Sequence, residues 1–228
     1  MNASYGLRAL GVSISWLLLV SCTNERIERI WLVDFAQPFP SRRADMDAFP
    51  SRYQGVYTAA DSSKSLCIGR TAVWRQELNS SLISWRELAA QQKRLLADST
   101  YQQDGVLHYL HRVGSDSVRD SWLECDTVFD CTKPETGRQR RFQGFFYLNT
   151  PTDSANKWQV ERLEISGRHL SWQALGQDTL RIRVLRPGTV HQYGSILYQL
   201  APATAAEARR ISRYEGLWET MGEYDRRH

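Results

Sequence analysis

Three arginines head the same hexamer, Arg-aromatic-Gln/Glu-Gly-x-aromatic, which occurs at residues 52–57, 141–146 and 213–218. A guanidinium group binds carboxylates and phosphates through paired N–H donors, so Arg52, Arg141 and Arg213 are candidates for an anion-binding site. The alternative is that each arginine pairs with a neighbouring strand and recurs because the structure is duplicated. The sequence favours this second interpretation, since duplicated residues follow most simply from duplicated structure.

Three cysteines follow the N-terminal region, at positions 67, 125 and 131. Cys125 and Cys131 enclose a short loop, and the sequence predicts a disulfide between them if the chain is exported to an oxidising compartment. Cys67 lies in the apolar triplet Leu66–Ile68, which predicts a buried thiol with a structural role.

The five histidines are scattered along the chain, at positions 108, 111, 169, 191 and 228. His108 and His111 lie in a segment, Val106–Arg112, that alternates like a β-strand. Three residues apart on a strand, the two rings face opposite sides, so they are not expected to bind one metal ion. The sequence predicts no metal site.

The chain carries no recognisable catalytic motif. It lacks a Gly-x-Ser-x-Gly nucleophile elbow, a His-Glu-x-x-His zinc motif, a phosphate-binding loop and a dinucleotide-binding glycine pattern. Glu161 and Glu164 fall on opposite faces of a predicted strand, which separates them as an acid–base pair. Asp116, Asp120 and Asp126 are expected to cap turns or face solvent. We therefore expect no catalytic residue, no cofactor and no enzymatic activity.

The first 22 residues have the layout of an export signal. One charged residue, Arg8, precedes an apolar run from Ala9 to Val20. As a helix this run would span about 18 Å, short of the roughly 30 Å hydrocarbon core of a bilayer. A positive start, a short apolar run and small residues at the cleavage point are typical of a secretory signal peptide.

The end of that run, Leu19-Val20-Ser21-Cys22, resembles the lipobox of bacterial lipoproteins. The resemblance implies cleavage before Cys22 and a diacylglycerol on its thiol; the alternative is an ordinary signal peptide that ends near a cysteine. Two or three acyl chains would attach the protein permanently, since each buried CH₂ contributes about 0.8 kcal/mol. Thr23 follows, where the bacterial sorting rule has aspartate for inner-membrane retention. The resemblance therefore implies the outer membrane, on either its periplasmic or its outer face.

The charge pattern bears on the class of partner. The net charge is +4, and residues of both signs are mixed along the chain. The basic clusters Arg138–Arg141 and Arg226–His228 are short and isolated, which is typical of solvated loops and tails. We expect no nucleic-acid partner.

Residues 22–50 are expected to form a lipidated N-terminus and a tether, and residues 51–228 the folded body. The segment Glu25–Phe35 is amphipathic, which predicts a short helix or strand. Three prolines, at positions 38, 40 and 50, then break regular structure and hold the chain extended.

The hexamer indicates internal duplication. After the first copy, Leu66–Trp74 reads Leu-x-Ile, a Gly-Arg turn, three residues and tryptophan. After the second copy, Leu163–Trp172 reads the same with one insertion. Two strands around a Gly-Arg turn make a β-hairpin. We therefore predict repeat units at about 52–140 and 141–212, and a closing strand at 213–218.

In each hexamer the glycine stands between two aromatic residues. If the hexamer is a strand, residues two apart share a face, so both rings and the glycine lie on one side. Rings that cover a bare glycine backbone allow a sheet to bend sharply, as in curved sheets and barrels.

The remaining patterns are mostly those of strands, predicted at residues 106–112, 117–124, 179–184 and 194–200. A capping box at Ser84–Glu87 predicts one inserted helix that reaches Ala97, and a weaker helix is predicted at 203–210. The predicted fold class is mainly β: an antiparallel meander or a curved, barrel-like sheet with internal duplication and one inserted helix.

The Gly-x-aromatic motif is similar to the Gly-x-Trp motif of lipocalins, which implies a small apolar ligand in a barrel mouth. A lipocalin carries the motif once and has no helix in the middle of its sheet, so the resemblance covers only these short stretches. Taken whole, the chain resembles the outer-membrane lipoproteins of Bacteroidota, which mostly lack assigned activities.

The expected function is that of a lipid-anchored protein of the cell envelope. The pattern behind it is a lipobox, a proline-broken tether and a repeat that packing explains. We expect a non-enzymatic binding or assembly module, which meets the membrane through the lipid on Cys22 and has an envelope protein as partner. The alternatives are a lipocalin-like carrier of a small apolar ligand and an envelope hydrolase.

Overall fold

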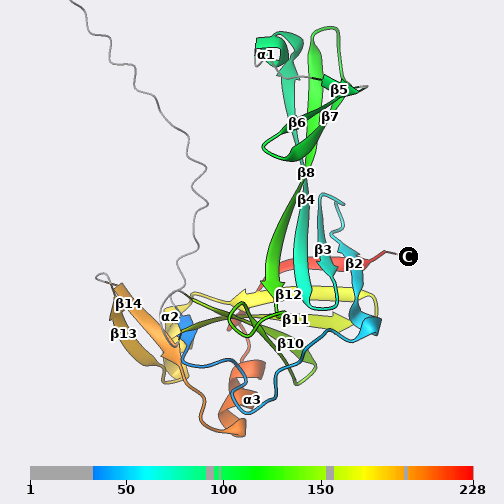
Figure 1. Cartoon of the computed structure of the whole chain (residues 1–228). Coiled ribbons are helices and arrows are strands. Elements are labelled where there is room, and N and C mark those ends of the chain that lie inside the picture. Colours follow the sequence, from blue (N-terminus) through cyan, green and yellow to red (C-terminus); the bar gives the residue numbers. More distant parts are fainter. Residues whose placement is uncertain (1–32, 91–94, 98, 153–156, 193–194, 228) are drawn as a thin grey trace, which may run out of the picture. The chain divides into compact units, whose positions relative to one another are not determined.

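The computed structural model describes residues 33–90, 95–97, 99–152, 157–192 and 195–227 (Figure 1). Within these ranges the chain is mainly β, as predicted, and its fifteen strands belong to one sheet. The strands are β1 (Val33–Phe35), β2 (Gly55–Thr58), β3 (Lys64–Ile68), β4 (Ala72–Ser84), β5 (Leu95–Ala97), β6 (Thr100–Gln103), β7 (Val106–Arg112), β8 (Ser117–Asp130), β9 (Arg138–Phe142), β10 (Phe145–Pro151), β11 (Trp158–Ser166), β12 (His169–Leu175), β13 (Gly188–Gln192), β14 (Ser195–Leu200) and β15 (Trp218–Arg226). The helices are α1 (Trp85–Ala90), α2 (Thr179–Val184) and α3 (Ala205–Arg213), with a 3₁₀ turn at Ser51–Tyr53. The predicted signal peptide and Cys22 lie outside the described residues.

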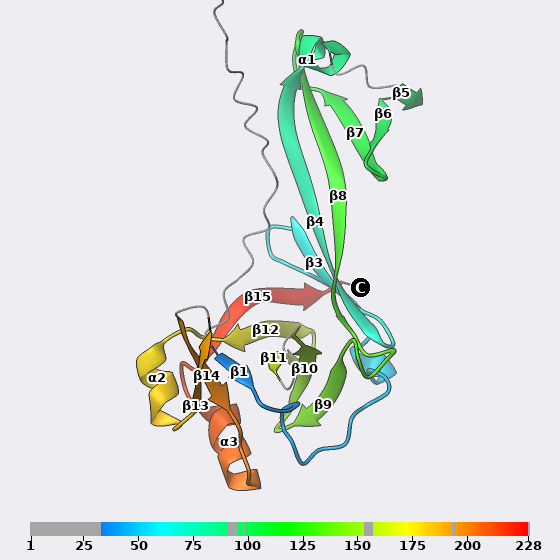
Figure 2. The same cartoon turned by 60° about the vertical axis from the view of Figure 1, so that its left-hand side comes forward.

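Each of the two predicted repeat units contains a three-stranded antiparallel meander, β2–β3–β4 in the first and β10–β11–β12 in the second. In both, the predicted Gly-Arg turn joins the second strand to the third. β15 pairs with β12 on one side and with β2 on the other, so it joins the two meanders (Figure 2). The closing strand predicted at 213–218 is therefore wrong in position: residues 213–217 are the end of α3 and a turn, and the joining strand β15 begins at Trp218.

The sheet does not close into a barrel. Its path runs β13-β14-β1-β11-β12-β15-β2-β3-β4-β8-β7-β6-β5 and has two ends, and β10 and β9 branch from β11. β1 and β14 pair in parallel, and the other strand pairs of the described chain are antiparallel.

The predicted bend inside a strand is wrong, because two of the hexamer glycines lie in turns and the third is the first residue of a strand. Gly144 and Gly216 have φ values of +92° and +70° and lie in the turns before β10 and β15. Gly55, with φ +143°, opens β2. Such backbone conformations are readily adopted by glycine alone. The aromatic residue that ends each hexamer is buried, so the motif turns the chain and then anchors the new strand in the core.

The predicted tether is wrong for residues 33–50, which pack into the body. β1 is a strand of the sheet, and Phe35, Phe39 and Phe49 are at most 1% exposed. The buried Asn149 accepts a hydrogen bond from the Phe39 amide at 2.5 Å and donates to the Phe39 carbonyl at 3.0 Å. Aromatic burial outweighs the three prolines here, because the prolines prevent regular structure but not packing. Residues 22–32 of the proposed tether lie outside the described ranges.

The inserted helix is present but short. Ser84 and Glu87 form the predicted capping box at the start of α1, whereas Leu95–Ala97 is a strand and not the end of the helix. The second predicted helix is α3, capped by Thr204 and Glu207. In the part of the chain that the structure describes, no helix is long and apolar enough to span a bilayer.

The strand predicted at residues 179–184 is wrong, because the segment is helix α2. The Asp178 side chain accepts hydrogen bonds from the amides of Leu180 and Arg181, which satisfies donors of the first turn. Ile182 is fully buried while Leu180 is exposed, so the alternation of Leu, Ile and Val does not build one buried face.

Two apolar cores cover the two faces of the second meander. On β10, Tyr147 belongs to the core that includes α3 and β1, whereas Phe146 and Leu148 belong to the core shared with the first meander. A strand in the middle of such a meander is covered on both sides. A charged side chain that points into one of these cores is then buried.

Candidate anion-binding site

Arg162 is a buried cation in the middle of the second meander. It lies on β11, opposite Tyr147 of β10 and Gln173 of β12, and only 8% of it is exposed. Burial lowers the pKa of its guanidinium, but an arginine titrates so far above neutral pH that the group stays charged.

Two hydrogen bonds set the position of this guanidinium. Its Nε donates to Gln173 Oε1 at 2.6 Å, and its Nη1 donates to the Ser212 carbonyl at 2.5 Å. Ser212 lies in the last turn of α3, where carbonyls have no partner within the helix and the helix dipole is negative. Arg162 therefore caps the C-terminal end of α3 from the side of the helix that faces the sheet.

Two aromatic rings lie against the same guanidinium. Its central carbon is 4.0 Å from the Phe145 ring centroid and 4.4 Å from that of Trp218. Trp218 is itself held by a hydrogen bond from Nε1 to the Ile211 carbonyl, at 3.0 Å. The π faces of the two rings attract the cation and shield it in part from water.

No carboxylate of the described chain lies within ion-pair distance of Arg162. Glu164, two residues along β11, is exposed and acts on it only through a longer-range charge interaction. Buried charges in proteins are almost always paired, because an unpaired one loses its hydration without compensation. Arg162 is therefore a buried cation whose counter-ion is not supplied by the described residues.

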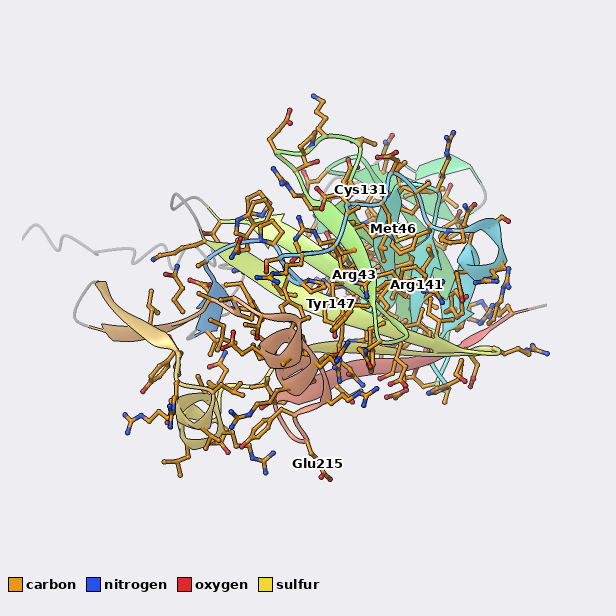
Figure 3. All side chains as sticks on the ribbon, turned by 90° about the horizontal axis from the view of Figure 1, so that it is seen from below. Arg43, Met46, Cys131, Arg141, Tyr147 and Glu215 are labelled. Carbon is orange, nitrogen blue, oxygen red and sulfur yellow. The ribbon has the colours of Figure 1, made fainter. Side chains whose placement is uncertain are left out.

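An open pocket of about 460 Å³ lies against Arg162. Besides Arg162, Phe145 and Trp218, its walls are Ser212, Arg213, Tyr214, Glu215 and Gly216, so the third hexamer forms most of it. In Figure 3 the Glu215 side chain points outward from its turn, whereas Tyr147 lies within the body. The pocket thus offers one buried guanidinium, a second one at the rim and aromatic walls, which suits an anionic group on a planar or apolar ligand.

The three hexamer arginines do not converge on one site. Arg213 lines the pocket and donates to Gln143 of the second hexamer. Arg141, labelled in Figure 3, donates to the Tyr53 hydroxyl of the first hexamer at 3.0 Å. Arg52 lies over the same Tyr53 ring, at 4.8 Å. The arginines thus connect one hexamer to the next through rings and polar groups, and Arg213 is the one of the three that lines this pocket.

The predicted disulfide between Cys125 and Cys131 is wrong, because Cys67, Cys125 and Cys131 are all free thiols. Cys125 is on the long strand β8 and Cys131 directly follows it, so six residues of extended chain place them about 20 Å apart. A disulfide needs α-carbons less than about 7 Å apart. Cys67 is partly buried, and its thiol donates to Gln76 Oε1 at 3.3 Å.

A second buried polar cluster lies on β6, β7 and β8. Asp120, which the sequence placed at a turn or in solvent, is 4% exposed near the start of β8. It accepts hydrogen bonds from the Tyr101 hydroxyl and from His108 Nδ1, the latter at 3.0 Å. Burial, followed by the bond to Asp120, raises the pKa of Tyr101. The His108 ring is stacked between Tyr101 and Trp122, so this cluster orders the sheet around it.

His108 and His111 lie on opposite faces of β7, as predicted. His108 is 8% exposed, and His111 is exposed. The two imidazoles therefore share no site.

Comparisons with protein-family models, curated proteins and solved structures found no significant match to this chain. The candidate site rests on its own geometry.

Sequence reasoning missed Arg162, although a signal was present. Around it, Val160 and Leu163 place apolar side chains on both faces of one strand, which is typical of a strand covered on both sides. A charged residue between them is expected to be buried and in need of a partner.

Proposed function

We propose that this chain is a lipid-anchored binding module of the bacterial envelope whose ligand presents an anionic group to Arg162. The observation that carries the binding site is that Arg162 is buried at the pocket wall with no carboxylate of the described chain in ion-pair distance. A carboxylate or phosphate group entering the pocket would meet two guanidinium groups, those of Arg162 and Arg213. The pocket walls contain no serine–histidine or cysteine–histidine pair that would make a nucleophile, so binding is favoured over hydrolysis.

The envelope location is supported by the sequence Leu19-Val20-Ser21-Cys22. Its test is incorporation of labelled palmitate into the wild-type chain and into Cys22→Ala. Label on the wild type alone supports the anchor. Label on both chains, or on neither, contradicts it.

The alternative of a carrier with a small apolar ligand inside a barrel has less support. The sheet path has two free ends, so it does not enclose the barrel mouth in which such a ligand would sit. The pocket at Arg162 is lined by charged groups as well as rings.

The anion site is tested by thermal unfolding in phosphate and in acetate, each against chloride at equal ionic strength. An anion at ten times its dissociation constant stabilises the fold by about 1.4 kcal/mol, which is a rise in melting temperature of roughly 3–6 °C. We expect this rise in the wild type and a clear loss of it in Arg162→Gln. Arg168→Gln, on the exposed turn between β11 and β12, is the matched control and should keep the full rise.

The reverse pattern would reject the site. Equal stabilisation of the wild type and Arg162→Gln would show that the anions act elsewhere, and no stabilisation beyond chloride would show that the pocket does not bind them. Because Arg162 also caps α3, Arg213→Gln provides a second variant at the exposed rim of the pocket. It should lower anion affinity with little effect on the melting temperature without anion.

A further inference from the structure

The long strands β4 and β8 carry exposed apolar side chains on one face and, apart from Arg119, their charges on the other. On β4, Trp74, Leu78 and Leu82 alternate with polar residues and point to the first face. On the second face, Arg75 forms an ion pair with Asp126 of β8 at 2.9 Å. Alternation of this kind normally marks which face of a sheet is buried.

The apolar face of these strands is nevertheless exposed. Leu123 on β8 lies opposite Leu78, and Tyr109 on β7 lies opposite Ser121 on the same face. Leu107 follows on that face of β7, since residues two apart share a side. We call Trp74, Leu78, Leu82, Leu107, Tyr109 and Leu123 the leucine face; their exposed fractions range from 36% for Trp74 to 64% for Leu82.

Scattered apolar residues are normal on a protein surface, but a continuous apolar face marks an interaction site. We propose that the leucine face is the interface through which two copies of this chain pair. The proposal is independent of the lipid anchor and of the Arg162 pocket, because neither Cys22 nor Arg162 belongs to this face.

The leucine face is complementary to itself. Between the leucines stand uncharged polar groups, Ser80 and its strand partner Ser121, so two such faces meet without like-charge repulsion at the centre. A two-fold axis that runs across the strands through the Leu78–Leu123 pair places the two copies face to face, with their strands in opposite directions. Trp74 then lies over Leu82 of the other copy, beside the exposed Arg119 that pairs with Leu82. Each copy gains a cation–π contact at each end of the interface.

A lipid surface fits the face less well. Ser80 and Ser121 lie among the leucines, and hydroxyl groups in hydrocarbon lose their hydrogen-bond partners, whereas in a protein interface they find new ones. The face also lacks the cluster of lysines and arginines that attracts anionic headgroups. In an interface with a second copy of the chain these hydroxyl groups can be hydrogen-bonded, and no basic cluster is needed.

Cross-linking in cells that produce the full chain tests the pairing. In a background of Cys22→Ser, Cys67→Ser, Cys125→Ser and Cys131→Ser, we introduce Leu123→Cys and add a short thiol-to-thiol cross-linker. Because Leu123 lies near the proposed axis, most of the chain should run as a dimer on a denaturing gel. Glu124→Cys, the next residue on β8 and on the opposite face, is the matched control and should remain monomeric. No dimer from Leu123→Cys, or equal dimer from both variants, would overturn the proposal.

The molar mass of the purified full chain, measured by light scattering, provides a second test that is independent of cysteine chemistry. We expect a dimer for the wild type and for Asn79→Lys, and at least a tenfold weaker dimer for Leu78→Lys. Asn79 is next to Leu78 in sequence but lies on the opposite face. Neither substitution should change the melting temperature of the monomer. A wild type that is monomeric at every concentration would mean that another occupant covers the leucine face, and the proposal would be wrong.

Discussion

Arg140 donates a hydrogen bond from Nε to Asp45 Oδ1 at 2.6 Å and so joins β9 to the segment that precedes the first hexamer. Its Nη1 also donates to the carbonyls of Pro38 and Pro40, at 2.6 and 2.9 Å. A single buried guanidinium thus satisfies three acceptors of a segment that has little regular structure. The packing of residues 38–45 depends on it.

We expect Arg140→Ala to lower the free energy of unfolding by about 2–4 kcal/mol, measured by urea denaturation. Two buried carbonyls lose their donor, and Asp45, which is partly exposed, recovers only its own hydration. Arg42→Ala, exposed on the same segment, should change stability by less than about 0.5 kcal/mol. Equal effects of the two substitutions would contradict this role of Arg140.

The buried Asp120 leads to a prediction about β6, β7 and β8. Asp120→Ala removes the acceptor of the Tyr101 hydroxyl and of the His108 ring, and should cost about 2–4 kcal/mol. Tyr101→Phe should cost less, and a double-mutant cycle should give a coupling energy of about 1 kcal/mol or more. Asp116→Ala, the same substitution at an exposed position just before β8, is the control. Additive effects of Asp120→Ala and Tyr101→Phe would argue against a shared network.

The backbone conformation of Gly55, the glycine of the first hexamer, disfavours any side chain at this position. Gly55 has φ +143°, and a Cβ there would lie 3.1 Å from Arg226 Nε. Arg226 Nη2 donates to the Gln54 carbonyl at 2.6 Å, so displacing it also loosens the join between β15 and β2. We expect Gly55→Ala to lower the melting temperature by several degrees, for a cost of about 1–3 kcal/mol. Gly114→Ala, where a Cβ meets nothing within 4 Å, should have little effect, and a similar loss at both sites would refute the argument.

Sequence patterns predicted the parts of this fold that depend on local order. The two hairpins follow from period-two alternation around Gly69 and Gly167, and the caps of α1 and α3 follow from Ser84 and Thr204. Segment 179–184 failed because a six-residue helix is too short to show helical periodicity, and its N-cap, Asp178, gave the only local signal.

The candidate site could not be predicted, because it is assembled from distant segments. Arg162 comes from β11, Phe145 from the start of β10 and Trp218 from the end of the third hexamer, more than fifty residues further along. Phe145 and Arg162 meet through the pairing of β10 with β11, but Trp218 joins them only through the pairing of β15 with β12, which leaves no local pattern. The buried Asp120 was missed for the same reason, since its partner Tyr101 lies on β6, across β7.

The cysteines give a chemical test of the strand assignment at β8. Burial raises the pKa of the thiols of Cys67 and Cys131, which lowers their thiolate fraction, while Cys125 is exposed. In the native protein we expect a maleimide to modify Cys125 first. In denaturant without reductant all three should react, as counted by mass spectrometry. Protection of Cys125 and Cys131 until a reductant is added would mean that they are bonded, and β8 would be wrong.

His169 makes the join between β12 and β15 sensitive to pH. Its Nδ1 is 3.3 Å from Asp225 Oδ1 and its Nε2 is 2.5 Å from Glu223 Oε2, and the bond to Asp225 is the main cause that raises the pKa of the imidazole. A raised folded-state pKa means that the stabilisation is fully present below the unfolded value of about 6.5 and is lost as pH rises through the folded-state pKa. Since His169 is about half exposed, we expect a loss of less than about 1 kcal/mol between pH 6 and 8. Unfolding by urea across this range should show that loss in the wild type and not in His169→Gln, and the same pH dependence in both would assign it to other groups.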